Sequence, residues 1–198
     1  MYEGNKIDRK FENPIDNFIL DYICEPLSII CYSNNITPNT ITLIGVINAL
    51  VSYWFLYNYK IHYFILFFMF AYICDCLDGY LARKYNIESY FGDLFDHITD
   101  ILQYILLIVI LIKKYNFLKY NKLIILSICF IILMFITQGC QEKIMNQNNN
   151  SQILSNFKKM CSSSIEAKIN ILRFFGAGTT QLYSILLSYY LWSQKIKR

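Results

Sequence analysis

The chain has 198 residues, of which 56% are hydrophobic and 16% are charged, and its formal net charge is +4. The charged fraction is well below the roughly 25% of ordinary soluble domains, which excludes a disordered protein and argues against a soluble globular one. No cluster of Lys and Arg contains interleaved aromatic residues, so nucleic acid is a poor candidate partner. The hydrophobic residues fall in long blocks, and we therefore expect an integral, multi-pass membrane protein.

Residues 1–36 are predicted to form an N-terminal arm and an interfacial amphipathic helix. Charges are spread through this region without an uninterrupted apolar core, so no signal peptide is expected. Between Ile15 and Ile30 the apolar residues recur at helical spacing, and acidic residues occupy the opposite face. An acidic face is not attracted to lipid headgroups, so we expect this helix to pack against the membrane spans.

The remainder, residues 37–198, is predicted to be a single transmembrane domain. A span needs about 20 mainly apolar residues. The second and third candidates reach that length only if their acidic ends belong to the helix. The predicted spans are 37–59, 61–84, 92–114, 121–140 and 170–193, with a polar solvent loop at 141–164. The expected fold class is therefore all-α, a polytopic helical bundle of about five to six spans.

The distribution of basic residues does not decide the orientation of these spans. Ten Lys and Arg fall on the side of the N-terminus and eight on the other, so the positive-inside rule gives no signal. Five spans place the C-terminal tail on the side opposite the N-terminus.

Seven cysteines lie mostly inside apolar stretches, without a CxxC pair or the spacing of a metal site. We expect them to pack as small hydrophobic side chains. The seven positions are Cys24, Cys31, Cys74, Cys76, Cys129, Cys140 and Cys161.

Four aspartates provide the strongest chemical signal. Asp75 and Asp78 share a face at the end of one hydrophobic helix, and Asp96 and Asp100 share a face at the start of the next. Because only a short turn joins the two helices, the four carboxylates are expected in one small volume near the membrane surface. A solvated helical hairpin explains one such pair, but it does not explain two matching pairs.

Four like charges at a membrane need positive compensation, and one arginine is insufficient. Ligands that offer only oxygen favour Mg²⁺ or Mn²⁺ over zinc. One or two such ions are suited to gripping a pyrophosphate during phosphoryl transfer. The small residues Gly79, Ala82 and Gly92 would let a backbone or a flat nucleotide approach closely.

The full pattern is Asp75-x2-Asp78-Gly79-x2-Ala82-Arg83-x8-Gly92-x3-Asp96-x3-Asp100. It resembles the signature of the CDP-alcohol phosphotransferases, also called CDP-alcohol phosphatidyltransferases. The segment from Thr37 to Leu43, which contains Pro38-Asn39, resembles the opening of that family's first span. The resemblance covers about residues 10–115.

This resemblance implies an enzyme that transfers a substituted phosphate from a CDP-alcohol to an acceptor hydroxyl and releases CMP. It implies two Mg²⁺ or Mn²⁺ ions, an active site that faces the cytosol, and a homodimer. Among the site residues, it implies metal ligands at Asp75, Asp78 and Asp96, a further ligand and catalytic base at Asp100, and contacts to the CDP-alcohol at Gly79, Ala82 and Arg83. Lys168 and Arg173 could face a substrate phosphate, although snorkelling to the interface is the favoured role.

Local similarity leans toward ethanolamine or choline phosphate as the transferred group, with diacylglycerol as acceptor. The alternative is a CDP-diacylglycerol-dependent enzyme that uses inositol or, less favoured, serine or glycerol phosphate. A glycerol phosphate acceptor would need a dedicated basic cluster, which the sequence does not offer. An ion-coupled transporter is the alternative outside enzymes, but it would need acids spread across the bilayer rather than gathered at one end of two spans.

Overall fold

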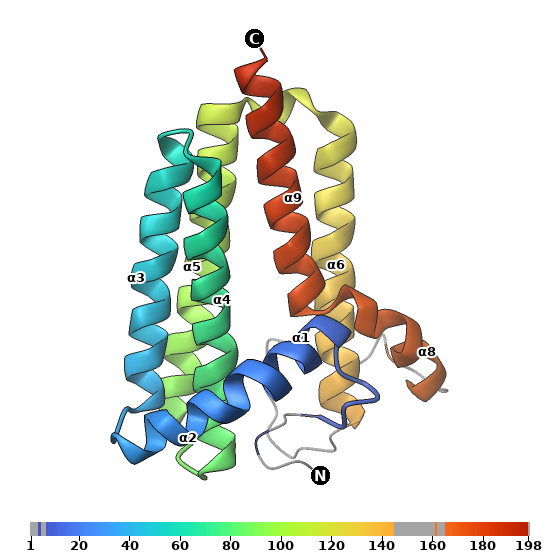
Figure 1. The fold of residues 1–198 in the computed structure, drawn as a ribbon. Coiled ribbons are helices and arrows are strands. Elements are labelled where there is room, and N and C mark those ends of the chain that lie inside the picture. Colours follow the sequence, from blue (N-terminus) through green and yellow to red (C-terminus); the bar gives the residue numbers. More distant parts are fainter. Residues whose placement is uncertain (1–3, 5–6, 145–160, 162–164, 198) are drawn as a thin grey trace. The chain divides into compact units, whose positions relative to one another are not determined.

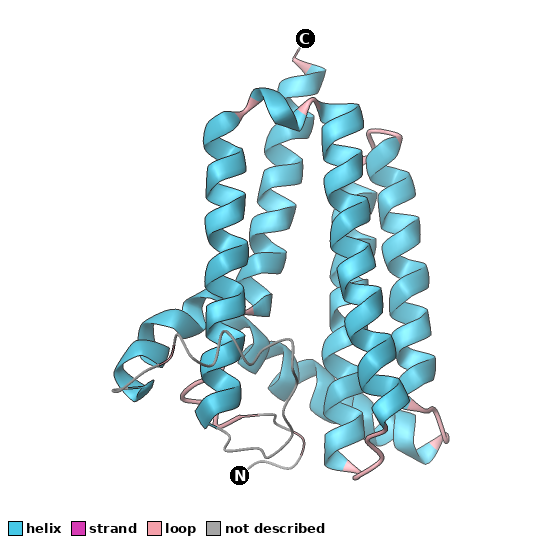
Figure 2. Ribbon diagram, turned by 180° about the vertical axis from the view of Figure 1, so that it is seen from behind, coloured by secondary structure: helices cyan, strands magenta, loops and turns pink. Residues whose placement is uncertain are grey.

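The computed structural model describes residues 4, 7–144, 161 and 165–197. All regular structure in these residues is helical, as the sequence predicted (Figures 1 and 2). The chain divides into two compact units. The first unit consists of Met1–Lys6, Phe18–Lys119 and Ser184–Arg198, and the second of Ile7–Asn17 and Tyr120–Tyr183.

The predicted N-terminal helix is present as three consecutive segments, α1 (Pro14–Ile19), the π-helical turn η1 (Leu20–Cys24) and α2 (Glu25–Ser33). Within the first unit, both η1 and α2 contact α4 (Ile61–Lys84). Cys24 and Ser28 are fully buried, whereas Tyr22 is 71% exposed. The helix therefore packs one face against a predicted span, as its sequence pattern indicated.

The first three predicted spans are helices α3 (Pro38–Tyr57), α4 and α5 (Tyr90–Tyr115). Thr37 caps α3 by accepting a hydrogen bond from the Thr40 amide, and Pro38 occupies the first turn. Ser89 caps α5 in the same way through the Gly92 amide. The turn between α4 and α5 contains Asn86 in the left-handed region, which asparagine tolerates better than most residues.

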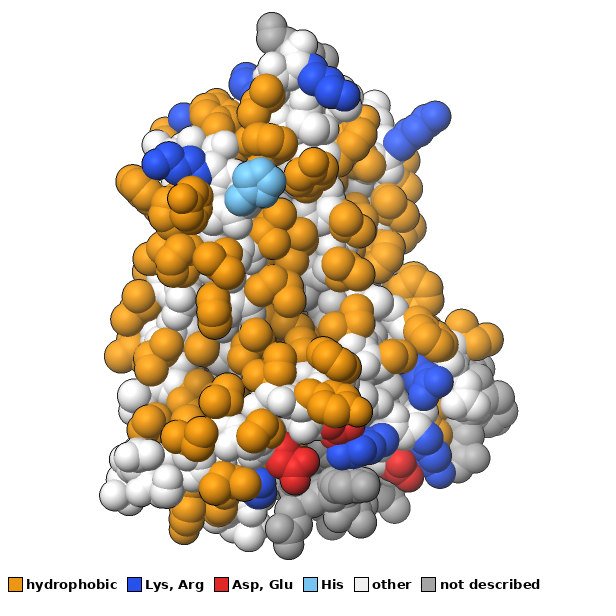
Figure 3. Space-filling model, in the orientation of Figure 1, with side chains coloured by type: hydrophobic (Ala, Val, Ile, Leu, Met, Phe, Trp, Pro, Cys, Tyr) orange, Lys and Arg blue, Asp and Glu red, His pale blue; other side chains and the backbone are white. Residues whose placement is uncertain are grey.

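The side chains of these helices suit a lipid environment. On the face drawn in Figure 3, hydrophobic side chains cover the length of the helices and charged ones lie toward the ends. On α3, Leu43, Ile47, Leu50 and Trp54 are each about half exposed. The solvent that fits such a surface is hydrocarbon rather than water.

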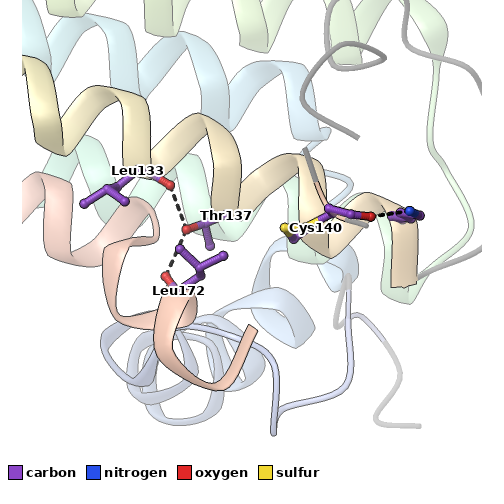
Figure 4. Close-up of a disulfide and its surroundings, with 6 residues drawn as sticks. Leu133, Thr137, Cys140 and Leu172 are labelled. Carbon is purple, nitrogen blue, oxygen red and sulfur yellow. Dashed lines mark hydrogen bonds between the residues drawn. A yellow bond between two sulfur atoms is a disulfide. The ribbon is translucent and has the colours of Figure 1, made fainter. Parts of the chain in front are cut away.

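The second unit contains α6 (Asn121–Ile144), α8 (Ile165–Leu172), the 3₁₀ turn η3 (Arg173–Phe175) and the beginning of α9 (Ala177–Ile196). α6 packs against α8 and η3. The Thr137 hydroxyl lies 2.8 Å from the Leu133 carbonyl oxygen and 2.9 Å from that of Leu172, which ties the two helices together (Figure 4). The core of this unit is formed by Ile7, Phe11, Cys140, Cys161 and Ile169.

Cys140 and Cys161 form a disulfide, with Cα atoms 5.6 Å apart. For these two residues the prediction of unpaired, packed thiols was wrong. They lie 21 residues apart, and no local motif indicates that Cys161 lies against Cys140 of α6. The other five cysteines remain thiols, as expected.

Among the described residues, four helices are long and apolar enough to cross a membrane, namely α3, α4, α5 and residues 121–141 of α6. Residues 141–144, predicted as the start of the solvent loop, are instead the last residues of α6. Residues 145–160 and 162–164 of the predicted loop lie outside the described part of the chain.

The fifth predicted span, 170–193, was wrong as drawn. The chain is interrupted by η3 and by the extended backbone of Gly176, and a continuous helix begins only at Ala177. α9 has 20 residues but is less apolar than the other four helices, because it contains several polar residues. Among these, Thr180, Gln181, Ser184 and Ser188 are buried. Its exposed residues include Leu182 and Leu186, so its outer surface is still apolar.

Candidate functional site

Three aspartates from two helices converge in the first unit. One carboxylate oxygen from each of Asp75, Asp96 and Asp100 lies within 4.8 Å of the other two, and all three residues are half-buried. Asp75 lies on α4, while Asp96 and Asp100 lie in the first three turns of α5. Because the chain reverses between α4 and α5, the last turns of α4 and the first turns of α5 lie at the same end of the helix pair. This is the convergence that the sequence predicted for these three carboxylates.

Asp78 lies one turn beyond Asp75 on α4 and differs from the other three in its surroundings. It is only 4% exposed and accepts a hydrogen bond from the Thr42 hydroxyl, with Thr42 Oγ1 at 2.5 Å from Asp78 Oδ2. It is not one of the three aspartates whose oxygens converge within 4.8 Å. The structure therefore brings three of the four predicted carboxylates together and directs the fourth toward α3.

The predicted nucleotide residues follow on the last turns of α4. The Arg83 guanidinium folds over Gly79, where a Cβ atom would lie 3.0 Å from Arg83 Nη1. Arg83 Nε also donates a hydrogen bond to the Gly4 carbonyl oxygen at 2.9 Å. Ala82 is half-buried beside them. Gly79 thus leaves space that the guanidinium occupies.

Gly92 allows a close approach between α3 and α5. A Cβ atom at this position would lie 2.9 Å from both Asn39 Oδ1 and Ser89 Oγ. Asn39 belongs to the Pro38-Asn39 segment at the start of α3. The start of α5, which carries Asp96, is therefore seated against the start of α3.

Asn39 and Thr42 are the two site neighbours to which the sequence assigned no role. The segment that contains them was conspicuous, but nothing local indicated that Asn39 meets Gly92 or that Thr42 meets Asp78. Helical spacing does show that the two side chains lie close together on α3, three residues apart.

Cys24 lies in η1, which packs against α4. Its side chain is fully buried in η1. Burial, and to a smaller extent the negative charge of Asp78, raises the pKa of the Cys24 thiol to about 12. The thiol therefore stays protonated at neutral pH.

Other residues singled out from the sequence belong to the second unit, to the opposite end of α4, or to the positions whose side chains are not described. In the second unit, Arg173 Nη1 donates a hydrogen bond to the Lys10 carbonyl oxygen at 2.7 Å. His62 packs edge-on against Trp192 in the first unit. The side chains of Lys168 and His97 are outside the described part of the structure.

The chemistry of the donor set fits a hard divalent cation. Two unit charges about 4 Å apart repel each other by about 4 kcal/mol at the effective dielectric constant of a protein surface, so three adjacent carboxylates favour a bound cation. All three offer oxygen, which Mg²⁺ and Mn²⁺ prefer. Arg83 lies about two turns beyond Asp75 on α4, and a guanidinium suits a ligand with phosphate groups.

Comparison with known proteins gives a consistent family. A family model described as CDP-alcohol phosphatidyltransferase matches residues 35–193. A CDP-diacylglycerol–glycerol-3-phosphate 3-phosphatidyltransferase of Rickettsia felis is 43% identical over 67 residues, which is 34% of this chain and 37% of the relative. A CDP-diacylglycerol–inositol 3-phosphatidyltransferase of Arabidopsis thaliana is 33% identical over 92 residues, or 46% of this chain and 38% of the relative.

The similarity to these two relatives therefore spans less than two fifths of their own length. No solved structure matches the chain.

Proposed function

Because this chain belongs to the CDP-alcohol phosphatidyltransferase family, we propose that it transfers a phosphatidyl group from CDP-diacylglycerol to a hydroxyl of a small polyol and releases CMP. The observation that carries this proposal is the convergence of Asp75, Asp96 and Asp100 at the end of two apolar helices. Such a site can hold a charged headgroup at the membrane surface while acyl chains remain in the lipid.

The choice of donor follows the named relatives. The sequence alone leaned toward CDP-ethanolamine or CDP-choline, with diacylglycerol as acceptor. The enzymes of Rickettsia felis and Arabidopsis thaliana are instead named for CDP-diacylglycerol. We therefore prefer the alternative named above, a CDP-diacylglycerol-dependent enzyme.

We assign the metal ligands to Asp75, Asp78, Asp96 and Asp100, which would hold two Mg²⁺ or Mn²⁺ ions. Bound ions would neutralise the pyrophosphate and the charge that develops as CMP departs. Gly79, Ala82 and Arg83 would lie along the cytidine diphosphate.

Asp100 is proposed as the catalytic base. Its carboxylate would accept the proton of the acceptor hydroxyl as that oxygen attacks the phosphorus atom that carries diacylglycerol. The new phosphorus–oxygen bond forms while the bond from that phosphorus to the oxygen of CMP breaks. The products are a phosphatidyl polyol and CMP, and the proton remains on Asp100 until it is released to solvent.

The acceptor is proposed only as a polyol, because the named relatives include both glycerol phosphate and inositol enzymes. A glycerol phosphate acceptor carries two negative charges and needs basic residues near the aspartates. Arg83 and Lys84 lie at this end of α4, but they already contact Gly4 and Ser28. Inositol is uncharged and needs no such residues.

Two further parts of the proposal concern orientation and assembly. The aspartate end of α4 and α5 is proposed to face the cytosol, where CDP-activated substrates are accessible. We also propose a homodimer, which would cover part of the apolar surface of each copy.

The test is a CMP-release assay on the purified protein with three substrate pairs, namely CDP-diacylglycerol with inositol, CDP-diacylglycerol with glycerol 3-phosphate, and CDP-ethanolamine with diacylglycerol. We expect product in one of the first two reactions, with Mg²⁺ or Mn²⁺ present, and none after chelation. Product only with CDP-ethanolamine would overturn the donor assignment. Absence of CMP release from all three pairs would overturn the proposed function.

A further inference from the structure

Thr42 is the residue that contacts the most deeply buried of the four aspartates. It lies in the second turn of α3, is 7% exposed, and faces Asp78 of α4, which is 4% exposed. The Thr42 hydroxyl donates a hydrogen bond to Asp78, with the two oxygens 2.5 Å apart. The two residues are 36 positions apart in the sequence, so the contact exists only because α3 and α4 pack side by side.

The packing of the two helices explains why this hydroxyl reaches the carboxylate. Gly45 lies one turn beyond Thr42, and a Cβ atom there would be 3.1 Å from the Cys74 Cβ atom and 3.4 Å from the Ala71 carbonyl oxygen. Cys74 in turn lies one turn before Asp78 on α4. The absence of a side chain at Gly45 thus lets the backbones approach at this level, and the next turn brings Thr42 against Asp78.

The Thr42 hydroxyl has two acceptors within reach but only one proton. Its Oγ1 atom lies 3.2 Å from the Pro38 carbonyl oxygen, the intrahelical acceptor typical of a threonine, and 2.5 Å from Asp78. A carboxylate is the stronger acceptor, and the shorter distance agrees with donation to Asp78. The hydroxyl therefore holds one oxygen of Asp78, Oδ2, in place.

Asp78 differs in this respect from the three converging aspartates. Asp75, Asp96 and Asp100 are half-buried, and each offers an oxygen to a common volume. Asp78 is more deeply buried and is held from the α3 side, one turn along α4 from Asp75. A ligand oxygen that is already fixed before the cation binds loses less conformational entropy on binding than one that is mobile.

We propose that Thr42 is a positioning residue that fixes the Asp78 carboxylate for binding of the divalent cation. The inference rests on the proposed function, since it requires Asp78 to be a ligand. Thr42 itself touches neither cation nor substrate and acts only through Asp78. Removal of its hydroxyl lowers cation affinity first, and transfer activity falls as a consequence.

The experiment measures equilibrium binding of Mn²⁺ to the purified, metal-free protein in detergent, by electron paramagnetic resonance of the unbound ion. Thr42→Val keeps the shape of the side chain and removes the hydroxyl, and Thr42→Ser keeps the hydroxyl. Loss of a hydrogen bond to a charged group predicts about tenfold or greater weakening of Mn²⁺ binding in Thr42→Val. Thr42→Ser should remain within about threefold of the original protein.

A double-mutant cycle separates positioning from a general effect on folding. In the Asp78→Asn background, Thr42→Val should cause little further loss of Mn²⁺ affinity, because the group that it positions is no longer a carboxylate. The thermal unfolding midpoint of each variant in EDTA reports the stability of the metal-free protein, so a general folding defect can be recognised. If Thr42→Val does not fold, Thr42→Ala takes its place, and its Mn²⁺ affinity is compared with that of Thr42→Ser.

The outcomes distinguish this inference from the proposed function. Unchanged Mn²⁺ affinity in Thr42→Val, with weakened affinity in Asp78→Asn, would overturn the positioning role and leave the metal site intact. Equal losses in Thr42→Val and Thr42→Ser would also overturn it, since the hydroxyl would then be irrelevant. Unchanged affinity in Asp78→Asn would instead overturn the assignment of Asp78 as a ligand.

Discussion

The indole N–H of Trp192 donates a hydrogen bond to the carbonyl oxygen of Tyr59, with the two atoms 2.8 Å apart. Trp192 lies near the end of α9, and Tyr59 follows α3 in the turn that leads to α4. Both residues belong to the first unit. The ring of Tyr59 also packs edge-on against Tyr115 at the end of α5. The C-terminal end of α9 therefore lies beside the ends of α3 and α5, and the aspartates lie at the other end of α5.

This contact predicts that the C-terminus and the aspartates face opposite sides of the membrane. A single cysteine introduced at Lys197 and one introduced at Glu88, an exposed residue of the turn before α5, should react with an impermeant maleimide from opposite sides. The measurement uses sealed vesicles that contain the protein with its seven native cysteines replaced. Labelling of both positions from the same side would contradict the prediction and would show that α9 does not cross the membrane.

Asp75→Asn and Asp96→Asn are each expected to lower turnover by more than about a hundredfold, since loss of one carboxylate weakens a shared cation site. Asp100→Asn should reduce the rate more than it reduces nucleotide binding, because its main role is to accept a proton. CMP release and binding of CDP-diacylglycerol are measured in parallel. Glu88→Gln removes an acidic group of the α4–α5 turn and is the matched control, which should retain its activity.

A divalent cation should stabilise the folded protein as well as activate it. The three carboxylates repel one another, and a cation that binds only the folded state adds about 2.7 kcal/mol of stability at a hundred times its dissociation constant. The unfolding midpoint in detergent should therefore rise when Mn²⁺ replaces EDTA. The rise should disappear in Asp96→Asn, and the same rise in that variant would show that Mn²⁺ acts elsewhere.

Gly92→Ala is expected to separate activity from stability. Alanine is the better helix former by up to about 1 kcal/mol, but displacement of the Ser89 cap of α5 costs a similar amount, so the unfolding midpoint should change little. The added methyl group meets the side chains of Asn39 and Ser89 at 2.9 Å and must displace them or the start of α5. Because small displacements of catalytic groups are costly, turnover should fall by about tenfold or more.

The control for Gly92→Ala is the same substitution in an Asn39→Ala background. One of the two close contacts is then absent, and the further loss of turnover should be smaller than in the original protein. Equal losses in both backgrounds would show that Asn39 is not the group that the methyl displaces.

The disulfide between Cys140 and Cys161 should be detectable as a cross-linked peptide that disappears on reduction. Closure of a chain segment of this length contributes about 3 kcal/mol to stability in the chain-entropy account. Cys140→Ser should therefore lower the unfolding midpoint under non-reducing conditions and have little effect under reducing ones. Cys129→Ser, on the exposed surface of α6, is the matched control. Detection of the two cysteine peptides as separate, unlinked species before reduction would contradict the bond.

The amino-acid sequence by itself determined the membrane character, the helical class and the position of the acidic ends of α4 and α5. These properties are local, because apolar length and the period of 3.6 residues are fixed by consecutive residues. The convergence of Asp75 with Asp96 and Asp100 followed from the same reasoning, since only a short turn separates α4 from α5. The family was also evident, because eight signature positions lie at fixed spacing within 26 residues of one hairpin.

Only the tertiary structure decided which distant groups meet. The Thr42–Asp78 hydrogen bond depends on the packing of α3 against α4, and the Cys140–Cys161 bond depends on the return of the chain to α6. The interruption at Gly176, which divides the predicted fifth span, accompanies a close approach to Asn13, far away in the sequence. Each of these contacts joins residues that no periodic pattern connects, so hydrophobic spacing carries no information about them.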